Sequence, residues 1–167
     1  MDVPNKALVM VGDGPLRPQL TEMIESREID SVWFAGFQSR NHLPEYYAIA
    51  DVLVLPSERE TWGIVVSEAL CFGLPVIVSD QVGARSDLVQ HESNGFVFPP
   101  GDVDSLTAYL EQVANLSNDE RSAMRAKSLE LITNWSAMDL GKALDRCFDS
   151  LAPTNSHQHP TEPPVRV

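Results

Sequence analysis

The sequence predicts an α/β fold: an open, mostly parallel, doubly wound (Rossmann-like) sheet of about five strands with flanking helices. Three observations predict it. Short apolar runs alternate along the chain with segments whose apolar residues recur at helical spacing. Several runs are apolar at every position, which is typical of strands buried on both faces of a parallel sheet. The 167 residues show no internal repeat or linker, so a single domain is expected.

The expected strands are short and continuous, and the expected helices fill the intervals between them. In chain order the strand candidates are 7–11, 32–35, 52–55, 76–78 and 96–98. The helix candidates cover 16–24, 43–50, a stretch beginning near residue 63 or 64, a short helical or irregular piece within 83–89, a stretch capped at 102 or 104 that runs to 113, then 117–131 and 136–148. We expect the first run, Ala7–Val11, to be buried on both faces. Pro15 suits the first position of the first helix, and Asp102 or Asp104 can cap a later one.

The final residues lack the pattern of a core. From residue 152 the chain is rich in Pro, Thr, Ser and His, so 152–167 is predicted to be a disordered tail after a domain over 1–151. His157 and His159 lie in this tail, but two histidines alone do not make a metal site. No metal site is therefore predicted.

Charge and cysteine content exclude several classes of protein. The chain carries 24 Asp and Glu against 12 Lys and Arg, a net charge of -12, which argues against a nucleic-acid partner. Any anion must then be bound by a local site. No apolar run approaches the roughly 18 residues of a membrane span, and the start does not resemble a signal peptide. Cys71 is expected to be a small core residue and Cys147 to lie in the last helix, so a reducing, cytoplasmic setting is predicted.

The stretch 60–68 holds the strongest functional signal. Glu60 and Glu68 stand at its ends with seven residues between them, and the stretch lies between two strand candidates, 52–55 and 76–78. This order is that of a strand–loop–helix–strand unit, in which the loop after the first strand carries the chemistry.

The residue types in this stretch suit a ligand with a phosphate and hydroxyl groups. A helix that begins near Gly63 or Ile64 presents unpaired N–H groups and the positive end of its dipole to an anion. Gly63 lets a phosphate approach the backbone closely. The carboxylates of Glu60 and Glu68 can accept hydrogen bonds from vicinal hydroxyls on either side of it. A nucleotide-sugar has this chemistry.

Simpler explanations exist for each signal. Two glutamates at this spacing are usually solvated surface residues, and only their place between two buried strands raises their weight. The Gly-x-Gly-Pro turn with Gly12 and Gly14 is more often a plain strand-to-helix connection than a ligand contact. Arg85, in the loop after the strand 76–78, is a possible phosphate partner but is more often a solvated cation.

The chain resembles the donor-binding, C-terminal half of a retaining glycosyltransferase of family four, the "glycosyl transferases group 1" family with the GT-B fold. The resemblance extends from about Ala7 to Leu151. It rests on six motifs in the family's order, which are VGDGP (11–15), FAGF (34–37), ADVLVLPS (50–57), ETWGIVVSEAL (60–70), GLPVIVSD (73–80) and NGFVFPPGD (94–102).

The resemblance implies a role for each matching position. Glu60 would touch the hydroxyls of the transferred sugar at the catalytic centre, and Glu68 would hold the ribose. The positions implied in donor binding are Thr61, Trp62, Gly63, Ile64, Val65, Glu68, Gly12, Gly14, Gly36 and Phe37. The family needs no cofactor beyond the nucleotide-diphosphate-sugar co-substrate, and generally no metal. A UDP- or GDP-sugar would give up its sugar to an acceptor with retention, and the acceptor would be a glycan, a lipid or a small molecule.

Two departures from the family pattern stand out. Thr61-Trp62-Gly63 replaces the usual Gly-Phe-Gly, which keeps the glycine. The family's first strand, with a following Arg and Lys that neutralise the pyrophosphate, has no counterpart here, and neither has the N-terminal acceptor domain. We therefore expect a fragment that takes the missing segment from a partner chain, or that closes the gap by pairing the strands 7–11 and 52–55.

Three functions remain open at this point. The first is a glycosyltransferase, or the donor half of one. The second is a module that binds a nucleotide-sugar without turnover, because the two cations and the acceptor domain are missing. The third is a sugar-nucleotide epimerase on the same fold, which the glutamate spacing disfavours. A cytoplasmic location is expected, with peripheral attachment to a membrane as the alternative common in the family.

Overall fold

A computed structural model describes residues 6–135, and these residues form an α/β structure with five parallel strands. The elements in chain order are β1 (Leu8–Val11), α1 (Arg17–Ser26), β2 (Val32–Gly36), α2 (Leu43–Ile49), β3 (Leu53–Leu55), α3 (Ile64–Cys71), β4 (Val76–Ser79), α4 (Arg85–Leu88), β5 (Gly95–Phe98), α5 (Val103–Ala114) and α6 (Asn118–Asn134). The predicted class and the order of these elements are confirmed. The predicted helix 136–148, the tail 152–167, Cys147 and the two tail histidines lie outside the described residues. The chain divides into two compact units after Thr133.

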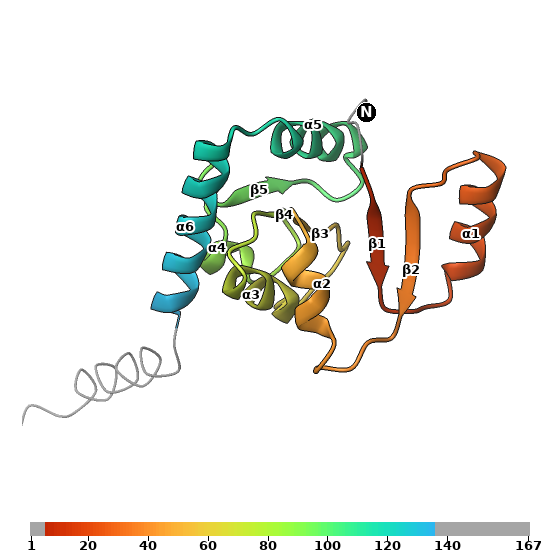
Figure 1. Cartoon of the computed structure of the whole chain (residues 1–167), viewed down its shortest axis with the longest axis horizontal. Coiled ribbons are helices and arrows are strands. Elements are labelled where there is room, and N and C mark those ends of the chain that lie inside the picture. The colour runs from red at the N-terminus through yellow and green to blue at the C-terminus, as the bar shows by residue number, and fades with distance from the viewer. Residues whose placement is uncertain (1–5, 136–167) are drawn as a thin grey trace, which may run out of the picture. The chain divides into compact units, whose positions relative to one another are not determined.

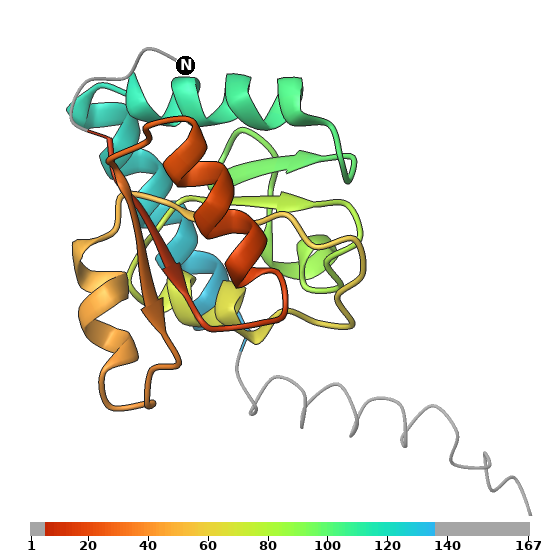
Figure 2. The same ribbon diagram turned by 90° about the vertical axis from the view of Figure 1, so that its right-hand side faces the viewer.

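The strands form two ladders instead of one sheet. β3, β4 and β5 pair in that order, and β1 pairs with β2, all in parallel register. Figures 1 and 2 show the β1–β2 pair, with α1 beside it, as a ladder separate from β4 and β5. Pairing of β1 with β3, one of the two expected ways to close the gap, does not occur between these described strands. In the doubly wound order the two strands flank a central one and are not neighbours, which accounts for the break.

The core of the unit is built around β4, whose four residues are all buried. Val76 and Val78 pack with the buried residues of α3 and α4 on one face, and Ile77 packs with Phe96 and residues of α5 and α6 on the other. Side chains of a strand alternate between its faces, so a continuous apolar run is what a strand with helices on both faces requires. This packing fixes the ends of β3 and β4, where the candidate site is expected.

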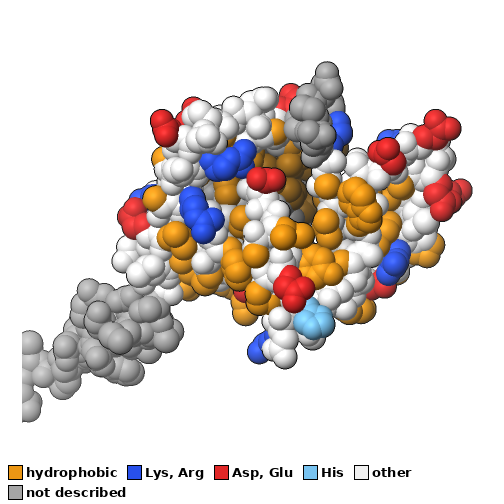
Figure 3. Space-filling model, in the orientation of Figure 1, with side chains coloured by type: hydrophobic (Ala, Val, Ile, Leu, Met, Phe, Trp, Pro, Cys, Tyr) orange, Lys and Arg blue, Asp and Glu red, His pale blue; other side chains and the backbone are white. Residues whose placement is uncertain are grey.

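β1 is more exposed than its apolar sequence predicts. Leu8 is 49% exposed and Val11 43%, and neither buried core cluster includes a residue of β1 or β2. Figure 3 shows hydrophobic side chains gathered over these two strands, beside a hollow that separates them from the rest of the unit. The expectation of burial on both faces is wrong, because among the described strands β1 has a partner on one edge only and lies outside both buried clusters.

Two smaller expectations are also wrong. Pro15 precedes α1, and Pro18 takes the early helical position instead, because the helix begins at Arg17. Cys71 is exposed, since the buried residues of α3 are Val66, Ala69 and Leu70, and position 71 lies on a different face of the helix.

Asp102 is the residue that caps α5. Its Oδ1 accepts a hydrogen bond from the Ser105 N–H at 2.9 Å, and its Oδ2 accepts one from the Ser105 hydroxyl at 2.7 Å. These bonds, the backbone one first, lower the pKa of Asp102 below its ordinary value of 3.8. The charged carboxylate is therefore the form that stabilises the helix end.

We expect Asp102→Ala to lower the urea midpoint of unfolding at neutral pH. Because the folded pKa is depressed, the contribution of the cap is fully present above the ordinary pKa and is lost as pH falls through the folded pKa. The difference between wild type and variant should therefore shrink below pH 3.8. Asp104→Ala, at an exposed first-turn position of the same helix, is the matched control and should change the midpoint less. A pH-independent difference would contradict the capping account.

Candidate functional site

The helix α3 begins where the sequence places it, directly after Gly63. Gly63 is the N-cap residue, with φ 91° and ψ 64°, and no side chain caps the helix. The first intrahelical turn bonds Val66 N–H to the Gly63 carbonyl at 2.9 Å. The N–H groups of Ile64 and Val65 precede this turn and have no partner in the helix itself. The start of α3 is thus a set of amide donors at the positive end of a helix dipole.

Glu60 is held in the loop before α3 by the segment that follows β4. The Glu60 N–H donates to the Gln81 carbonyl at 3.2 Å, and the Glu60 carbonyl accepts from the Gly83 N–H at 3.0 Å. Oε1 of Glu60 accepts a hydrogen bond from the Trp62 N–H at 3.3 Å, and the Ala84 N–H donates to the Trp62 carbonyl at 2.8 Å. The loop therefore lies across the carboxyl ends of both β3 and β4, and Glu60 is fixed beside the start of α3.

Gly63 is required at its position for two reasons. Its φ of 91° lies in the region that other residues rarely adopt, and an added Cβ would lie 3.0 Å from Val82 Cγ1 and 3.3 Å from Glu60 Cγ. The crowding shows that Gly63 and Glu60 are packed together. A glycine here is a structural need of the loop as well as a feature that lets a ligand approach.

We expect Gly63→Ala to destabilise the fold by about 3 kcal/mol, from backbone strain and crowding together. Gly101→Ala is the matched control, because Gly101 also has a positive φ, 79°, but its Cβ would meet nothing within 4 Å. That variant should cost only about 1 kcal/mol, the strain of the backbone alone. Urea unfolding of both variants measures the difference, and equal losses would contradict the close packing around Gly63.

Glu68 lies one turn into α3 and accepts a hydrogen bond from a side chain of α2. The Tyr47 hydroxyl, on α2, donates a hydrogen bond to Glu68 Oε2 at 2.7 Å. Both residues are half-buried. Burial, followed by this hydrogen bond, raises the pKa of Tyr47, so the hydroxyl stays protonated and remains a donor. A tyrosine 21 residues upstream carries no motif that would have linked it to Glu68.

The second group of predicted donor-binding residues lies at the ends of β1 and β2. The Gly12 N–H donates to the Gly36 carbonyl at 2.8 Å, and both glycines have positive φ. Phe37 follows with 83% of its surface exposed. Gly14 donates its N–H to Asp13, whose carboxylate also pairs with Arg17 at 2.7 Å. The geometry explains these glycines as turn residues, and their contact with a donor stays a prediction.

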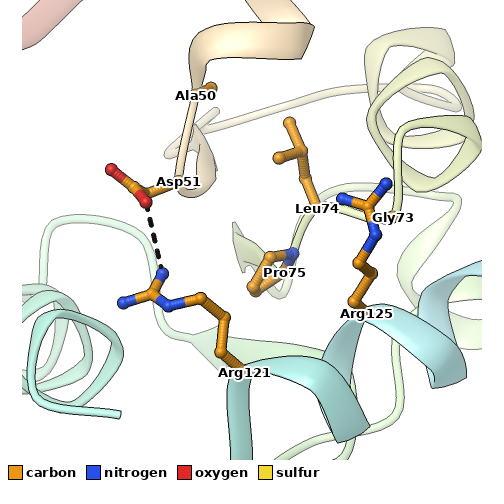
Figure 4. Close-up of a pocket in the computed structure, with 7 residues that line it drawn as sticks. All are labelled: Ala50, Asp51, Gly73, Leu74, Pro75, Arg121 and Arg125. Atoms are coloured by element: carbon orange, nitrogen blue, oxygen red, sulfur yellow. Dashed lines mark hydrogen bonds and ion pairs between the residues drawn. The ribbon is translucent and has the colours of Figure 1, made fainter. Parts of the chain in front are cut away.

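A cavity of about 170 Å³ lies at the amino ends of β3 and β4, opposite the carboxyl ends where the site is predicted. It is lined by residues that precede β3 and β4, among them Asp51 and Pro75, and by Arg121 and Arg125 of α6 (Figure 4). Arg121 pairs with Asp51 at 3.3 Å. The two arginines lie where α2 and α3 end, which is the end of a helix that favours a cation. The cavity is therefore accounted for by the packing of α6.

The structure also describes the residues considered as metal ligands or as a phosphate partner. Within residues 6–135 there is no group of three or more His, Cys, Asp or Glu that could hold a metal ion. Arg85, a possible phosphate partner by sequence, lies exposed at the start of α4 and donates from Nε to the Asp80 carbonyl at 2.6 Å. It belongs to the segment that holds the Glu60 loop, so it is near the predicted site but engaged with the backbone.

A comparison with protein families decides which fold family this unit represents. The family described as "Glycosyl transferases group 1" matches residues 2–130, which is most of the chain. The chain belongs to the glycosyl transferases group 1 family.

The chain is also similar to individual proteins in sequence and in fold. The chain is 35% identical to a sulfoquinovosyl transferase of Arabidopsis thaliana over 111 residues, 65% of this chain and 21% of that protein. A sucrose-phosphate synthase from Thermosynechococcus elongatus has a similar structure, with a TM-score of 0.72 and 27% identity over 89% of this chain and 40% of that one. The Anabaena protein HepE in complex with UDP-glucose gives a TM-score of 0.74 at 22% identity, over 88% and 42% of the two chains.

The chain spans 21% of the length of the sulfoquinovosyl transferase, 40% of the sucrose-phosphate synthase and 42% of HepE. The family and the α/β fold are thereby confirmed, whereas the role of each predicted site residue stays a prediction. No helix within the described residues has the length and apolar character needed to cross a membrane.

Proposed function

We propose that this chain is the donor-binding half of a retaining glycosyltransferase and binds a UDP- or GDP-sugar at the start of α3. The observation that carries the proposal is the place of the Glu60 carboxylate beside the start of α3, where Gly63 is the N-cap residue and no side chain caps the helix. The family membership supports sugar transfer, and the UDP-glucose in the HepE complex supports a nucleotide-sugar donor. No cofactor other than the donor is part of this proposal.

In this proposal each residue does one thing to the donor. The amides at the start of α3 bind the diphosphate and stabilise the charge that develops on it as the leaving group departs. Glu60 accepts hydrogen bonds from the sugar hydroxyls, and its charge faces the positive charge that develops at the anomeric carbon. Glu68 accepts hydrogen bonds from the ribose. Because the chain as a whole is strongly acidic, this local site must supply the attraction for the diphosphate.

We further propose that another polypeptide segment completes the transferase. The two ladders leave β1 and β3 each with one edge unpaired among the described strands, which supports a strand between them. The acceptor, whether glycan, lipid or small molecule, would be bound outside the unit described here. The chain's 40% coverage of the sucrose-phosphate synthase supports a larger enzyme of which this unit is one part.

A single time course separates this function from the alternatives. The transferase that joins this unit to the segment that completes it is incubated with UDP- and GDP-sugars and an added panel of acceptors, and the products are followed by proton NMR. A new glycoside with the donor's anomeric configuration would support the transferase. An epimerised sugar-nucleotide would contradict it, and donor binding without any product would favour a non-catalytic nucleotide-sugar module.

A further inference from the structure

We propose that Tyr47 is a positioning residue that orients the Glu68 carboxylate for the ribose of a bound nucleotide. The inference rests on the proposed function, in which Glu68 accepts hydrogen bonds from that ribose. The Tyr47 hydroxyl donates to Oε2 of Glu68 at 2.7 Å. A carboxylate has two oxygens, so Oε1 is left to accept a ribose hydroxyl.

Tyr47 holds Glu68 from a fixed point, because its ring packs against the same helix. The ring stacks on Phe72, with centroids 5.5 Å apart and planes at 26°. Phe72 is the C-cap residue of α3 and stands four residues after Glu68, so both lie on one face of the helix. Tyr47 and Phe72 also pack against the buried cluster formed by α3, β4 and α4.

The stacked ring and the hydrogen bond together fix the direction in which the Tyr47 hydroxyl donates. A glutamate on a helix surface otherwise samples many rotamers, and ordering it on binding weakens the affinity. A carboxylate that a neighbouring side chain already holds loses less conformational entropy when the ligand binds. Residues around a binding site commonly orient the ligand-contacting residues in this way. The raised pKa of Tyr47 agrees with this role, since a phenol that stays protonated keeps donating.

The test compares Tyr47→Phe with Tyr46→Phe in the full chain. Phe keeps the ring that stacks on Phe72 and removes only the hydroxyl. Tyr46 is the neighbouring half-buried tyrosine of α2 and contributes to neither the hydrogen bond nor the ring stack, so it is the matched control. Calorimetric titration is carried out with UDP and 2′,3′-dideoxy-UDP, or with the guanosine pair if GDP is the nucleotide that binds.

We expect Tyr47→Phe to weaken UDP binding by about fivefold, the worth of one net hydrogen bond, and to change dideoxy-UDP binding by less than about twofold. Tyr46→Phe should leave both affinities unchanged. In a chain that already carries Glu68→Ala, adding Tyr47→Phe should have no further effect on UDP binding, because Tyr47 acts through Glu68.

Three results would overturn the inference. The first is an unchanged UDP affinity in Tyr47→Phe, and the second is an equal loss for UDP and dideoxy-UDP, which would indicate a general structural role. The third is wild-type chain that folds cooperatively and binds neither UDP nor GDP, which would overturn the proposed function as well. If the wild-type chain binds UDP and Tyr47→Phe binds it with the same affinity, the proposed function stands and only this inference is wrong.

Discussion

In a transferase that joins this unit to the segment that completes it, Glu60→Gln is expected to reduce sugar transfer by on the order of 100-fold or more, while nucleotide affinity changes by less than about threefold. Glutamine keeps the size of the side chain and can still accept the hydrogen bond that Glu60 accepts from the Trp62 N–H. It loses the negative charge that the proposal places opposite the developing positive charge of the transferred sugar. Release of UDP or GDP from the sugar donor, with water or an added glycan as acceptor, measures the rate.

Glu58→Gln is the matched control for this experiment. Glu58 lies in the same loop and is exposed, so its replacement removes the same charge without touching the start of α3. We expect the Glu58 variant to transfer sugar at the wild-type rate. Equal rates for Glu60→Gln and Glu58→Gln would show that Glu60 has no part in the reaction.

Glu68→Ala is expected to weaken nucleotide binding by about 10- to 100-fold. Hydrogen bonds to a charged group contribute about 1.5–3 kcal/mol, and each 1.4 kcal/mol is about tenfold in affinity. The loss of affinity should be larger for ligands with an intact ribose, since the deoxy analogues have no hydroxyl that could donate a hydrogen bond to Glu68. Calorimetry with UDP or GDP and their deoxy analogues measures it.

Glu45→Ala serves as the control for Glu68→Ala. Glu45 is an exposed acidic residue in the first turn of α2, the helix that carries Tyr47. Its removal changes the net charge equally, so it separates a general electrostatic effect on an anionic ligand from a direct contact. An affinity for UDP or GDP that is the same in both variants would contradict the ribose contact.

The sequence predicts β4 and the start of α3 correctly, because residue composition and chain order indicate the same structure there. The run 76–78 is apolar at every position and becomes the fully buried centre of the larger ladder. Gly63 and the helix that follows it are placed correctly, because glycine is among the residues tolerated at a helix N-cap and an apolar segment follows it. The position of Glu60 beside that start follows from the chain order alone.

What the sequence does not predict depends on contacts between segments that are distant along the chain. The run 7–11 has the composition of a buried strand, yet exposure depends on which neighbours cover it, and β1 has one strand partner. The bond from Tyr47 to Glu68 joins two helices through side chains that no spacing rule connects. The hydrogen bonds from the β4 loop to Glu60 are backbone contacts, which residue types do not encode.

The measurement that tests the central claim most directly is calorimetric titration of this chain with UDP, GDP and a panel of UDP- and GDP-sugars. The account predicts micromolar binding of one nucleotide and its sugar, carried by the start of α3 between Glu60 and Glu68. A chain that melts cooperatively and binds none of these ligands would contradict it, because the fold would then be present without a donor site.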